Sequence, residues 1–457
     1  MVGGGITGLA AALRLRERLG PAAAIIVYEQ QSTLGGKLRT GELAGRPVER
    51  GADAFRMRDP AGGESAAVTL ARRVGLGEHL VHPARVPAAL VLDGALHPIP
   101  AGTLLGIPSD PAQVADVAPV AAGQDRDTGR PLLAPDADIA VGELVRQRLG
   151  SALVDRLVDP MLGGVYAGRA DTLSLAMTLP GLAAAARVAH TLTDAVSQAR
   201  AVTPAADGPM FGSVRGGLGR LAAATADASG ATIRQGLPVR ELTPVGDRWR
   251  LTVGSTRDPR LDETDAVVLA VPARPAARLL ASVASVAAEA SGELDCTSVA
   301  RVTLALPPDT SLPDRSGFLV PASEGLAVKA ATFLTRKWPH LAAPQAPVLV
   351  RASVGRYQEP GPLRSSDAAL VELVHAELAA LLGGLPPPLA HHVQRWGGAL
   401  PQYPPGHLDR VAAARAALPG TLGLAGAAYD GVGIPACVTS GQAAAAQVTA
   451  ALEESKA

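Results

Sequence analysis

Six residues near the start of the chain combine glycines at the spacing that a dinucleotide pyrophosphate requires. The stretch 3–8 follows the pattern G-x-G-x-x-G, and an apolar segment with helical spacing, Leu9–Leu19, follows it directly. The first glycine allows a tight turn, the second lets the backbone approach a pyrophosphate, and the third lets the helix pack against a strand. The helix N-terminus adds free N–H groups and the positive end of a dipole. The predicted phosphate-binding residues are Gly3, Gly4, Gly5, Ile6, Thr7 and Gly8.

An acidic residue ends the next apolar run. Ala24–Tyr28 reads as a short β-strand, and Glu29 and Gln30 follow it. A carboxylate about 20 residues after the glycines can accept both hydroxyls of an adenosine ribose and disfavours a 2′-phosphate. The strand before such a glycine turn needs about five residues, and only two precede Gly3. We therefore expect that the chain start is assigned too late or trimmed, and that this form binds its cofactor poorly.

A second glycine pair distinguishes a flavin from a nicotinamide. Gly35 and Gly36 are followed by Lys37 and Arg39, and this loop resembles the second-glycine motif of the FAD oxidases of the amine-oxidase superfamily. The resemblance implies that Gly36 and Lys37 lie along the pyrophosphate, although both basic residues could simply be surface charges. The segment Val48–Phe55 resembles the stretch that passes under the isoalloxazine. The residues predicted to contact the flavin there are Gly51, Ala52, Asp53 and Ala54.

The far end of the chain is predicted to complete the same site. In Thr421–Val448 a short apolar strand precedes Gly426, and a helix begins after a glycine-rich turn. A helix N-terminus aimed at a reduced flavin stabilises its negative charge. We interpret Cys437 as a small buried residue, so the FAD is expected to be non-covalent. The predicted contacts of this turn are Gly426, Val432, Gly433 and Ile434.

Several motifs in order narrow the resemblance. They are Asp159–Gly168, Arg336–His340, Arg395-Trp396, Leu400–Tyr403 and Gly431–Cys437. Together they resemble the FAD-dependent protoporphyrinogen and coproporphyrinogen oxidases of haem biosynthesis, and most closely the Gram-positive branch that acts on coproporphyrinogen III. The resemblance places Val239 against adenine, Trp396 against FAD and the Gly164 carbonyl opposite the pyrrole N–H groups. It also places Phe333 and Leu334 in the apolar wall of the substrate cavity.

The resemblance implies an oxygen-dependent, six-electron oxidation of the porphyrinogen that releases hydrogen peroxide. Each hydride is expected to pass to flavin N5, so no side chain is assigned as a catalytic acid or base. Protoporphyrinogen IX is an alternative substrate for the same site. Less favoured alternatives are another flavin enzyme, such as an amine oxidase or a desaturase, and a non-catalytic flavoprotein that carries porphyrin to a ferrochelatase. Ferrochelatase is also a candidate partner of the enzyme itself.

Composition excludes several classes of function. The chain has 42 basic residues (Lys and Arg combined) and 42 acidic residues (Asp and Glu combined). The resulting net charge of zero argues against a nucleic-acid partner. The two cysteines and nine histidines show no metal-binding spacing, so no metal site is predicted. No uninterrupted apolar run reaches about 18 residues, so no transmembrane segment is expected. With no secretion signal evident, the expected location is the cytoplasm.

The length of 457 residues favours about three domains. We predict an α/β protein with a Rossmann-like FAD-binding domain of the amine-oxidase/p-hydroxybenzoate-hydroxylase type, formed by residues 1–70, 206–272 and 410–457. A substrate domain of the α+β class should comprise residues 71–103 and 273–409, with strands at Val299–Leu306 and Val348–Val354. Residues 104–190 should form a helical subdomain.

Overall fold

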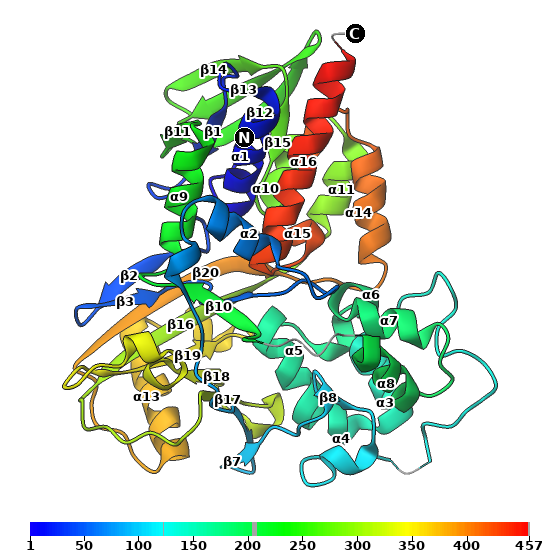
Figure 1. Ribbon diagram of the computed structural model, residues 1–457, viewed down its shortest axis with the longest axis vertical. Coiled ribbons are helices and arrows are strands. Elements are labelled where there is room, and N and C mark those ends of the chain that lie inside the picture. The colour runs from blue at the N-terminus through cyan, green and yellow to red at the C-terminus, as the bar shows by residue number, and fades with distance from the viewer. Residues whose placement is uncertain (122, 203–207, 456–457) are drawn as a thin grey trace.

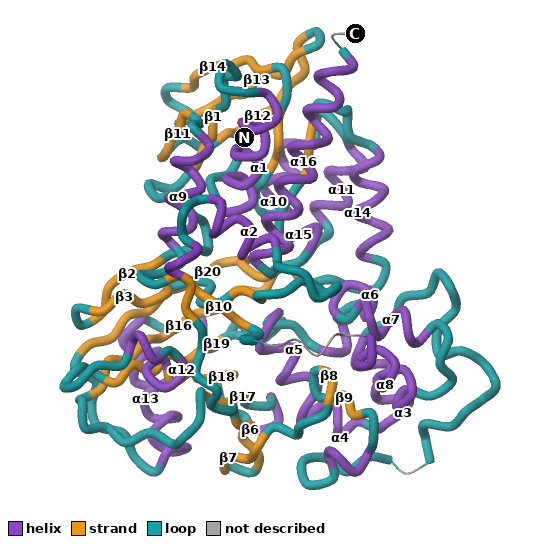
Figure 2. The backbone as a smooth tube through the Cα atoms, in the orientation of Figure 1, coloured by secondary structure: helices purple, strands orange, loops and turns teal. Residues whose placement is uncertain are grey.

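The computed structural model describes residues 1–121, 123–202 and 208–455. Residues 206–207 and 456–457, at the edges of two predicted FAD-domain segments, therefore lie outside the described residues. Figure 1 shows three groups of elements: parallel strands and long helices at the top, a mixed sheet at the lower left and short helices at the lower right. The long strands of the mixed sheet run beneath the upper group (Figure 2).

Both ends of the chain contribute strands to one parallel sheet. β1 (Ile26–Glu29) pairs with β11 (Thr232–Gln235), and β15 (Val267–Leu269) pairs with β21 (Leu422–Leu424). Val2 bridges β1 and β15 in parallel and so joins the two pairs. The strand expected before Gly3 is therefore represented by this single bridge. β21, near the C-terminus, pairs with β15, and Val2 bridges β15, so segments from both chain ends meet in one sheet.

Helices α1 (Ile6–Leu19) and α16 (Ile434–Glu454) lie against this sheet and against each other. Ile6 packs in one cluster with the start of α16, and Leu15 packs in another with Val448, so the two helices run parallel. Their N-termini consequently lie at the same end of the sheet. The contact is close because a Cβ on Gly441 would lie 2.1 Å from the Thr7 carbonyl oxygen.

Other elements cover the outer surface of this parallel sheet. β12 (Val239–Val245), β13 (Arg248–Gly254) and β14 (Pro259–Thr264) form an antiparallel sheet. α10 (Ala273–Leu280) and α11 (Ser285–Gly292), which lie within a predicted substrate-domain segment, share a buried cluster with β15 and β21. The remaining elements of this region are α2 (Ala66–Arg73), α9 (Gly219–Ser229), α14 (His407–Ala416) and α15 (Ala427–Asp430).

The mixed sheet has seven strands in the order β20-β16-β19-β18-β17-β6-β7. Helix α13 (Asp367–Leu382) packs on one face, where Val302 and Leu304 are buried. Alternation along β16 places Arg301 on the opposite face. The two strands predicted at Val299–Leu306 and Val348–Val354 are confirmed and correspond to β16 and β19. The strand bounds are β20 (Ala390–Pro401), β16 (Cys296–Leu306), β19 (Val348–Val354), β18 (Val328–Phe333), β17 (Gly317–Leu319), β6 (Ala89–Leu92) and β7 (Ala95–Pro98).

Short strands and turns connect the two sheets. β2 (Thr40–Leu43) and β3 (Arg46–Glu49) form a hairpin, while β4 (Phe55–Arg56) and β5 (Leu80–Val81) flank β10 (Phe211–Val214). α12 (Leu334–Lys337) follows β18 directly. The 3₁₀ turns are Gly77–His79, Pro111–Val114, Ala170–Thr172, Ala322–Glu324, Pro339–Leu341 and Gly361–Arg364.

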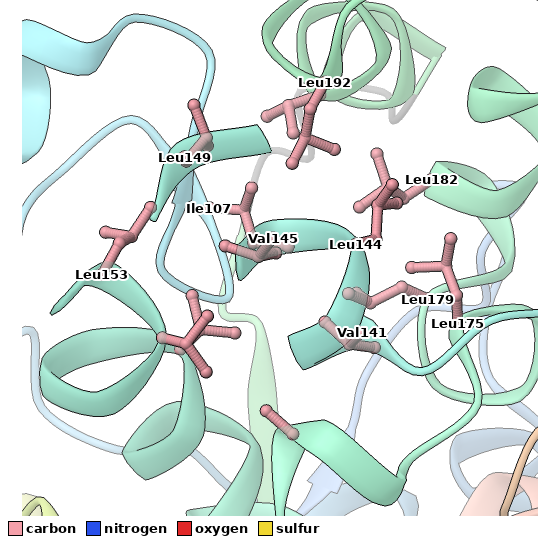
Figure 3. Close-up of a cluster of buried hydrophobic side chains, with 14 of the residues drawn as sticks. Ile107, Val141, Leu144, Val145, Leu149, Leu153, Leu175, Leu179, Leu182 and Leu192 are labelled. Atoms are coloured by element: carbon pink, nitrogen blue, oxygen red, sulfur yellow. The ribbon is translucent and has the colours of Figure 1, made fainter. Parts of the chain in front are cut away.

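The helical group buries a large aliphatic cluster of its own, part of which is shown in Figure 3. Residues 151–166 form a nearly continuous helix with a π-helical turn at Val154–Val158, a local widening that is frequent near functional sites. The elements are β8 (Thr103–Leu104), β9 (Ile107–Pro108), α3 (Val141–Leu149), α4 (Ser151–Leu153), α5 (Asp159–Tyr166), α6 (Leu175–Thr178), α7 (Pro180–Ala186) and α8 (Leu192–Val202). Within residues 1–121, 123–202 and 208–455, no helix is long and apolar enough to cross a membrane.

The α1–α16 contact makes a testable prediction. We expect Gly441→Ala to lower the free energy of unfolding by about 1–3 kcal/mol, because the new methyl group must push the two helix backbones apart. Gly181→Ala in α7 is the control, since a Cβ there meets no atom within 4 Å. Thermal unfolding of both variants tests the contact, and equal unfolding temperatures would contradict it.

Candidate active site

In the glycine turn, a side chain would clash with the backbone at Gly3 and Gly8 but would meet free space at Gly5. Gly3 has φ +106°, and a Cβ there would lie 2.4 Å from the Ala270 carbonyl oxygen. A Cβ on Gly8 would lie 2.0 Å from the Gly3 carbonyl oxygen, whereas one on Gly5 would meet nothing within 4 Å. The turn is thus tightly packed at its ends and open at Gly5, as a turn that admits a pyrophosphate requires.

The carboxylate of Glu29 lies directly beside this turn. Its Oε2 accepts a hydrogen bond from the Gly4 N–H and its Oε1 one from the Gln31 N–H, both at 2.8 Å, and the residue is buried. The Leu237 N–H donates to the Glu29 carbonyl oxygen at 3.0 Å, so the chain that enters β12 at Val239 passes the same place. Glu29 therefore contacts the glycine turn directly, Gln30 follows it and is exposed, and Val239 lies two residues after Leu237 in the passing chain.

The second glycine pair packs onto the first turn. The Gly35 N–H donates to the Gly4 carbonyl oxygen at 2.8 Å, and Gly36 approaches Gly5 closely. The next stretch is equally tight, because a Cβ on Gly51 would lie 1.9 Å from the Lys37 carbonyl oxygen. Burial lowers the pKa of the Lys37 ammonium, and a neighbouring anion would favour its charged form. The Ala52 N–H also donates to the Lys37 carbonyl oxygen, at 3.0 Å.

The C-terminal turn reaches the same place. Gly426 has φ +126° and donates its N–H to the Ser440 hydroxyl at 2.8 Å, and that hydroxyl donates to the Asp430 carboxylate. The first turn of α16 follows Val432 and Gly433, and no side chain caps its N–H groups. Those groups remain available to an electronegative atom of a ligand.

A buried charged cluster connects the loop of residues 49–53 to the mixed sheet. Asp53 Oδ2 accepts hydrogen bonds from Arg351 at 2.8 Å and from Lys337 at 3.3 Å. Burial alone would raise the pKa of Asp53, but Lys337, Arg351 and Arg301 together bring it well below its usual range. Arg301 itself donates to the Gly51 carbonyl oxygen. The sheet therefore holds the loop through charges, and Asp53 stays ionised.

Trp396 lies beside the same loop. Its indole Nε1–H, on β20, donates to the Arg50 carbonyl oxygen at 2.9 Å. Ala54 lies two residues beyond Ala52 in that loop and packs partly against the cluster that holds Leu334 and Trp338. The structure thus brings together, from three distant segments, the residues to which the resemblance assigns a flavin. Their contacts with the flavin stay predictions.

Helix α5 is linked through Tyr403 to α15, the short helix that precedes α16. The ring of Tyr166 meets the ring of Tyr403 edge-on, with centroids 5.8 Å apart, and the Tyr403 hydroxyl donates to the Ala427 carbonyl oxygen at 2.5 Å. Gly164 is exposed, and a Cβ on it would lie 3.2 Å from Cδ2 of Leu319. Gly164 belongs to the last turn of α5, where the helix leaves carbonyl groups unused.

The two predicted wall residues lie in different surroundings, and their contact with a substrate stays a prediction. Phe333 is fully buried on the α13 side of the mixed sheet, with its ring centroid 5.9 Å from that of Phe318. Leu334 lines a small pocket together with Glu49, Asp53 and Arg351. The side chain that lies beside Gly164 is that of Leu319, which was not among the predicted residues. Strand alternation was the available signal, because Leu319 follows the inward-facing Phe318.

Three cations of the mixed sheet were not predicted: Lys329 and Arg351 are buried, and Arg301 is half-buried. Arg301, Lys329 and Arg351 interrupt otherwise apolar β-branched runs, which is the pattern that could have revealed them. Charged residues are almost never fully buried unless they are paired. Their positions on strands of the mixed sheet are therefore informative even without a structure.

Comparison with known proteins identifies the family. Residues 6–449 match the family described as flavin containing amine oxidoreductase. This chain belongs to that family. The predicted superfamily, the fold class and the assignment as a flavin-dependent oxidoreductase are thereby confirmed. The family implies a flavin, and the open position at Gly5, the uncapped start of α16 and the buried Glu29 beside the glycine turn all fit one.

Relatives within the flavin-containing amine oxidoreductases extend over nearly the whole chain. A protein of Mycobacterium tuberculosis named coproporphyrinogen III oxidase is 37% identical over 465 residues, which cover 99% of this chain and 97% of that protein. One of the same name from Bacillus subtilis is 30% identical and covers 97% and 96%. The crystal structure of a putative protoporphyrinogen oxidase from Exiguobacterium superposes with a TM-score of 0.85, at 31% identity over 98% of each chain.

Glu49 lines the pocket beside Leu334, and its raised pKa predicts that the stability of the protein depends on pH. Burial raises the pKa of Glu49 from 4.5 to about 7, despite hydrogen bonds from the Leu218 N–H and the Thr40 hydroxyl. A raised folded-state pKa means that the contribution of Glu49 to stability is present at low pH and is lost as the pH rises through about 7. Glu49→Gln should therefore gain on the order of 2 kcal/mol relative to the wild type between about pH 5 and pH 8.

Thermal unfolding across that pH range measures the difference. Glu42→Gln on the neighbouring strand β2 is the control, since Glu42 is exposed. A constant difference between Glu49→Gln and the wild type at all pH values would show that Glu49 does not change its charge there.

Proposed function

We propose that this protein is an FAD-dependent coproporphyrinogen III oxidase of haem biosynthesis. It oxidises coproporphyrinogen III to coproporphyrin III in a six-electron reaction, with molecular oxygen as acceptor and hydrogen peroxide as product. The observation that carries the proposal is the 37% identity, over 99% of this chain, to a protein of that name. The cytoplasm and a ferrochelatase that receives the oxidised porphyrin complete the proposal.

The proposed FAD is non-covalent and lies between the two chain ends. The glycine turn and Glu29 hold its adenosine diphosphate, and the loop of residues 51–54 and the start of α16 hold its flavin. The thiol of Cys437 donates to the Gly431 carbonyl oxygen at 3.6 Å, and burial raises its pKa. A protonated thiol in that position is a poor nucleophile, which supports non-covalent binding. A bound flavin supplies the hydride acceptor.

The cavity side of the sheet supports a large anionic substrate. Leu319 lies beside Gly164, and Val165, the next residue of α5, is exposed, so both offer apolar surface near Gly164, which suits a macrocycle. Arg301 and Lys329 offer positive charge on the same side, which suits carboxylate groups. The chain thus contributes orientation and exclusion of water, while the aromatisation of the macrocycle drives the oxidation.

Protoporphyrinogen IX is the second candidate substrate. It is favoured by the likeness to the Exiguobacterium structure and by a rice chloroplast protein named protoporphyrinogen oxidase, which is 26% identical over 98% of this chain. That substrate has two carboxylates, where coproporphyrinogen III has four. The identity to the coproporphyrinogen III oxidase from M. tuberculosis is higher, so coproporphyrinogen III is proposed first.

An aerobic assay separates these candidates. FAD-loaded protein is mixed with each porphyrinogen, and kcat/KM is measured from porphyrin fluorescence together with the yield of hydrogen peroxide. We expect a clear preference for coproporphyrinogen III and about three peroxides per porphyrin, since each two-electron step reduces one oxygen. A preference for protoporphyrinogen IX would select the second candidate. Turnover of neither porphyrinogen would reject both and leave the carrier and the other flavin enzymes.

A further inference from the structure

Lys329 is a buried cation without a counter-ion. It lies on β18 at an irregularity between Val328 and Ala330, and only 8% of its surface is exposed. Its ammonium donates to the Gly163 carbonyl oxygen of α5 at 3.3 Å. Throughout the described part of the chain, no carboxylate forms an ion pair with it. A buried ammonium that contacts only a neutral oxygen is energetically costly.

The cations near Lys329 are committed to other partners. Arg356 donates to the carbonyl oxygens of Leu326, Val320 and Val328. Arg301 donates to the Gly51 carbonyl oxygen. Neither offers Lys329 a negative charge, and both repel its positive one. Burial, followed by Arg301 and Arg356, accordingly lowers the pKa of Lys329 to about 7.

The space in front of Lys329 is a small cavity between α5 and the mixed sheet. Its lining includes Gly163, Arg169, Lys329 and Arg356, and the carboxylate of Asp159. That carboxylate accepts hydrogen bonds from Arg169 at 3.2 Å and from the Ala170 N–H at 2.7 Å, so it is occupied. Arg169 also pairs with Glu359 at 2.9 Å. Among the described residues, the lining cations without an ion pair are therefore Lys329 and Arg356, and they give the cavity its excess of positive charge. A ligand that brings a carboxylate would supply the missing partner.

We propose that Lys329 binds one carboxylate of the substrate in this cavity, next to α5. The proposal rests on the proposed function, because the substrate is then a porphyrinogen with four propionate side chains. Bound there, one propionate holds the macrocycle beside Gly164 and Leu319 and neutralises the buried ammonium. Lys329 is thus a substrate-binding residue that favours a polycarboxylate over an uncharged porphyrinogen.

Coproporphyrin III, the stable oxidised form with the same four carboxylates, is the probe for the experiment. Its binding to FAD-loaded wild type and to Lys329→Met is measured by fluorescence quenching. We expect the dissociation constant to rise at least about tenfold in the variant, because a charge-assisted hydrogen bond is lost. The tetramethyl ester of coproporphyrin III should bind wild type and variant equally. Arg278→Met, an exposed position on α10, is the control and should not change either affinity.

Thermal unfolding provides an independent readout. Lys329→Met should unfold at the same or a higher temperature than the wild type without ligand, because an uncompensated buried charge is replaced by an apolar chain. Coproporphyrin III should stabilise the wild type more than the variant. If Lys329→Met does not fold, Lys329→Gln is measured in the same way.

Two outcomes separate this proposal from the proposed function. Equal binding of coproporphyrin III to wild type and variant, in a protein that oxidises coproporphyrinogen III, would overturn the role of Lys329 alone. A wild type that neither binds the porphyrin nor oxidises either porphyrinogen would overturn both. A loss of affinity that is the same for the tetramethyl ester would also overturn the proposal, since the effect would then not involve a carboxylate.

Discussion

The close approach of the α1 and α16 backbones at Gly441 determines where the N-termini of these two helices lie. Because Gly441 has no side chain, α16 packs directly against the Thr7 carbonyl at the start of α1. The two helix N-termini then face the same region, although more than 400 residues separate them in the sequence. Their free N–H groups and dipoles combine into one site with affinity for negative charge.

The mixed sheet is held onto that site by charge. Asp53 accepts from Arg351 and Lys337, and Arg301 reaches the neighbouring Gly51 carbonyl. A buried pair of this kind contributes little net stability but is costly to break, because one charge is left without a partner. It therefore acts mainly to keep the sheet in one position relative to the loop, and the cavity above the loop depends on that position.

The parts of the site that depend on local sequence were predictable, and those that depend on distant pairing were not. The glycine turn and Glu29 lie within 27 residues, and their spacing alone indicated the arrangement that the structure shows. Arg351 reaches Asp53, and Arg301 reaches the Gly51 carbonyl oxygen, only because β16 pairs with β19 and the sheet then approaches the loop. No local pattern contains that information. Strand alternation separates the faces to which Phe318 and Leu319 point, but which of these faces meets Gly164 depends on the register of the sheet.

The same sheet face holds two kinds of buried cation, and their surroundings distinguish what each does. Arg351 lies within a hydrogen bond of Asp53, so its charge is balanced within the protein and its role is structural. Among the described residues, Lys329 hydrogen-bonds only to the Gly163 carbonyl oxygen, so its charge is balanced when an anion enters from outside. Folding the chain with Lys329 unpaired costs stability, and that cost is recovered on binding. A buried charge without a partner in the protein is energetically costly. A binding residue of this kind is therefore recognised by the partner it lacks, rather than by the contacts it makes.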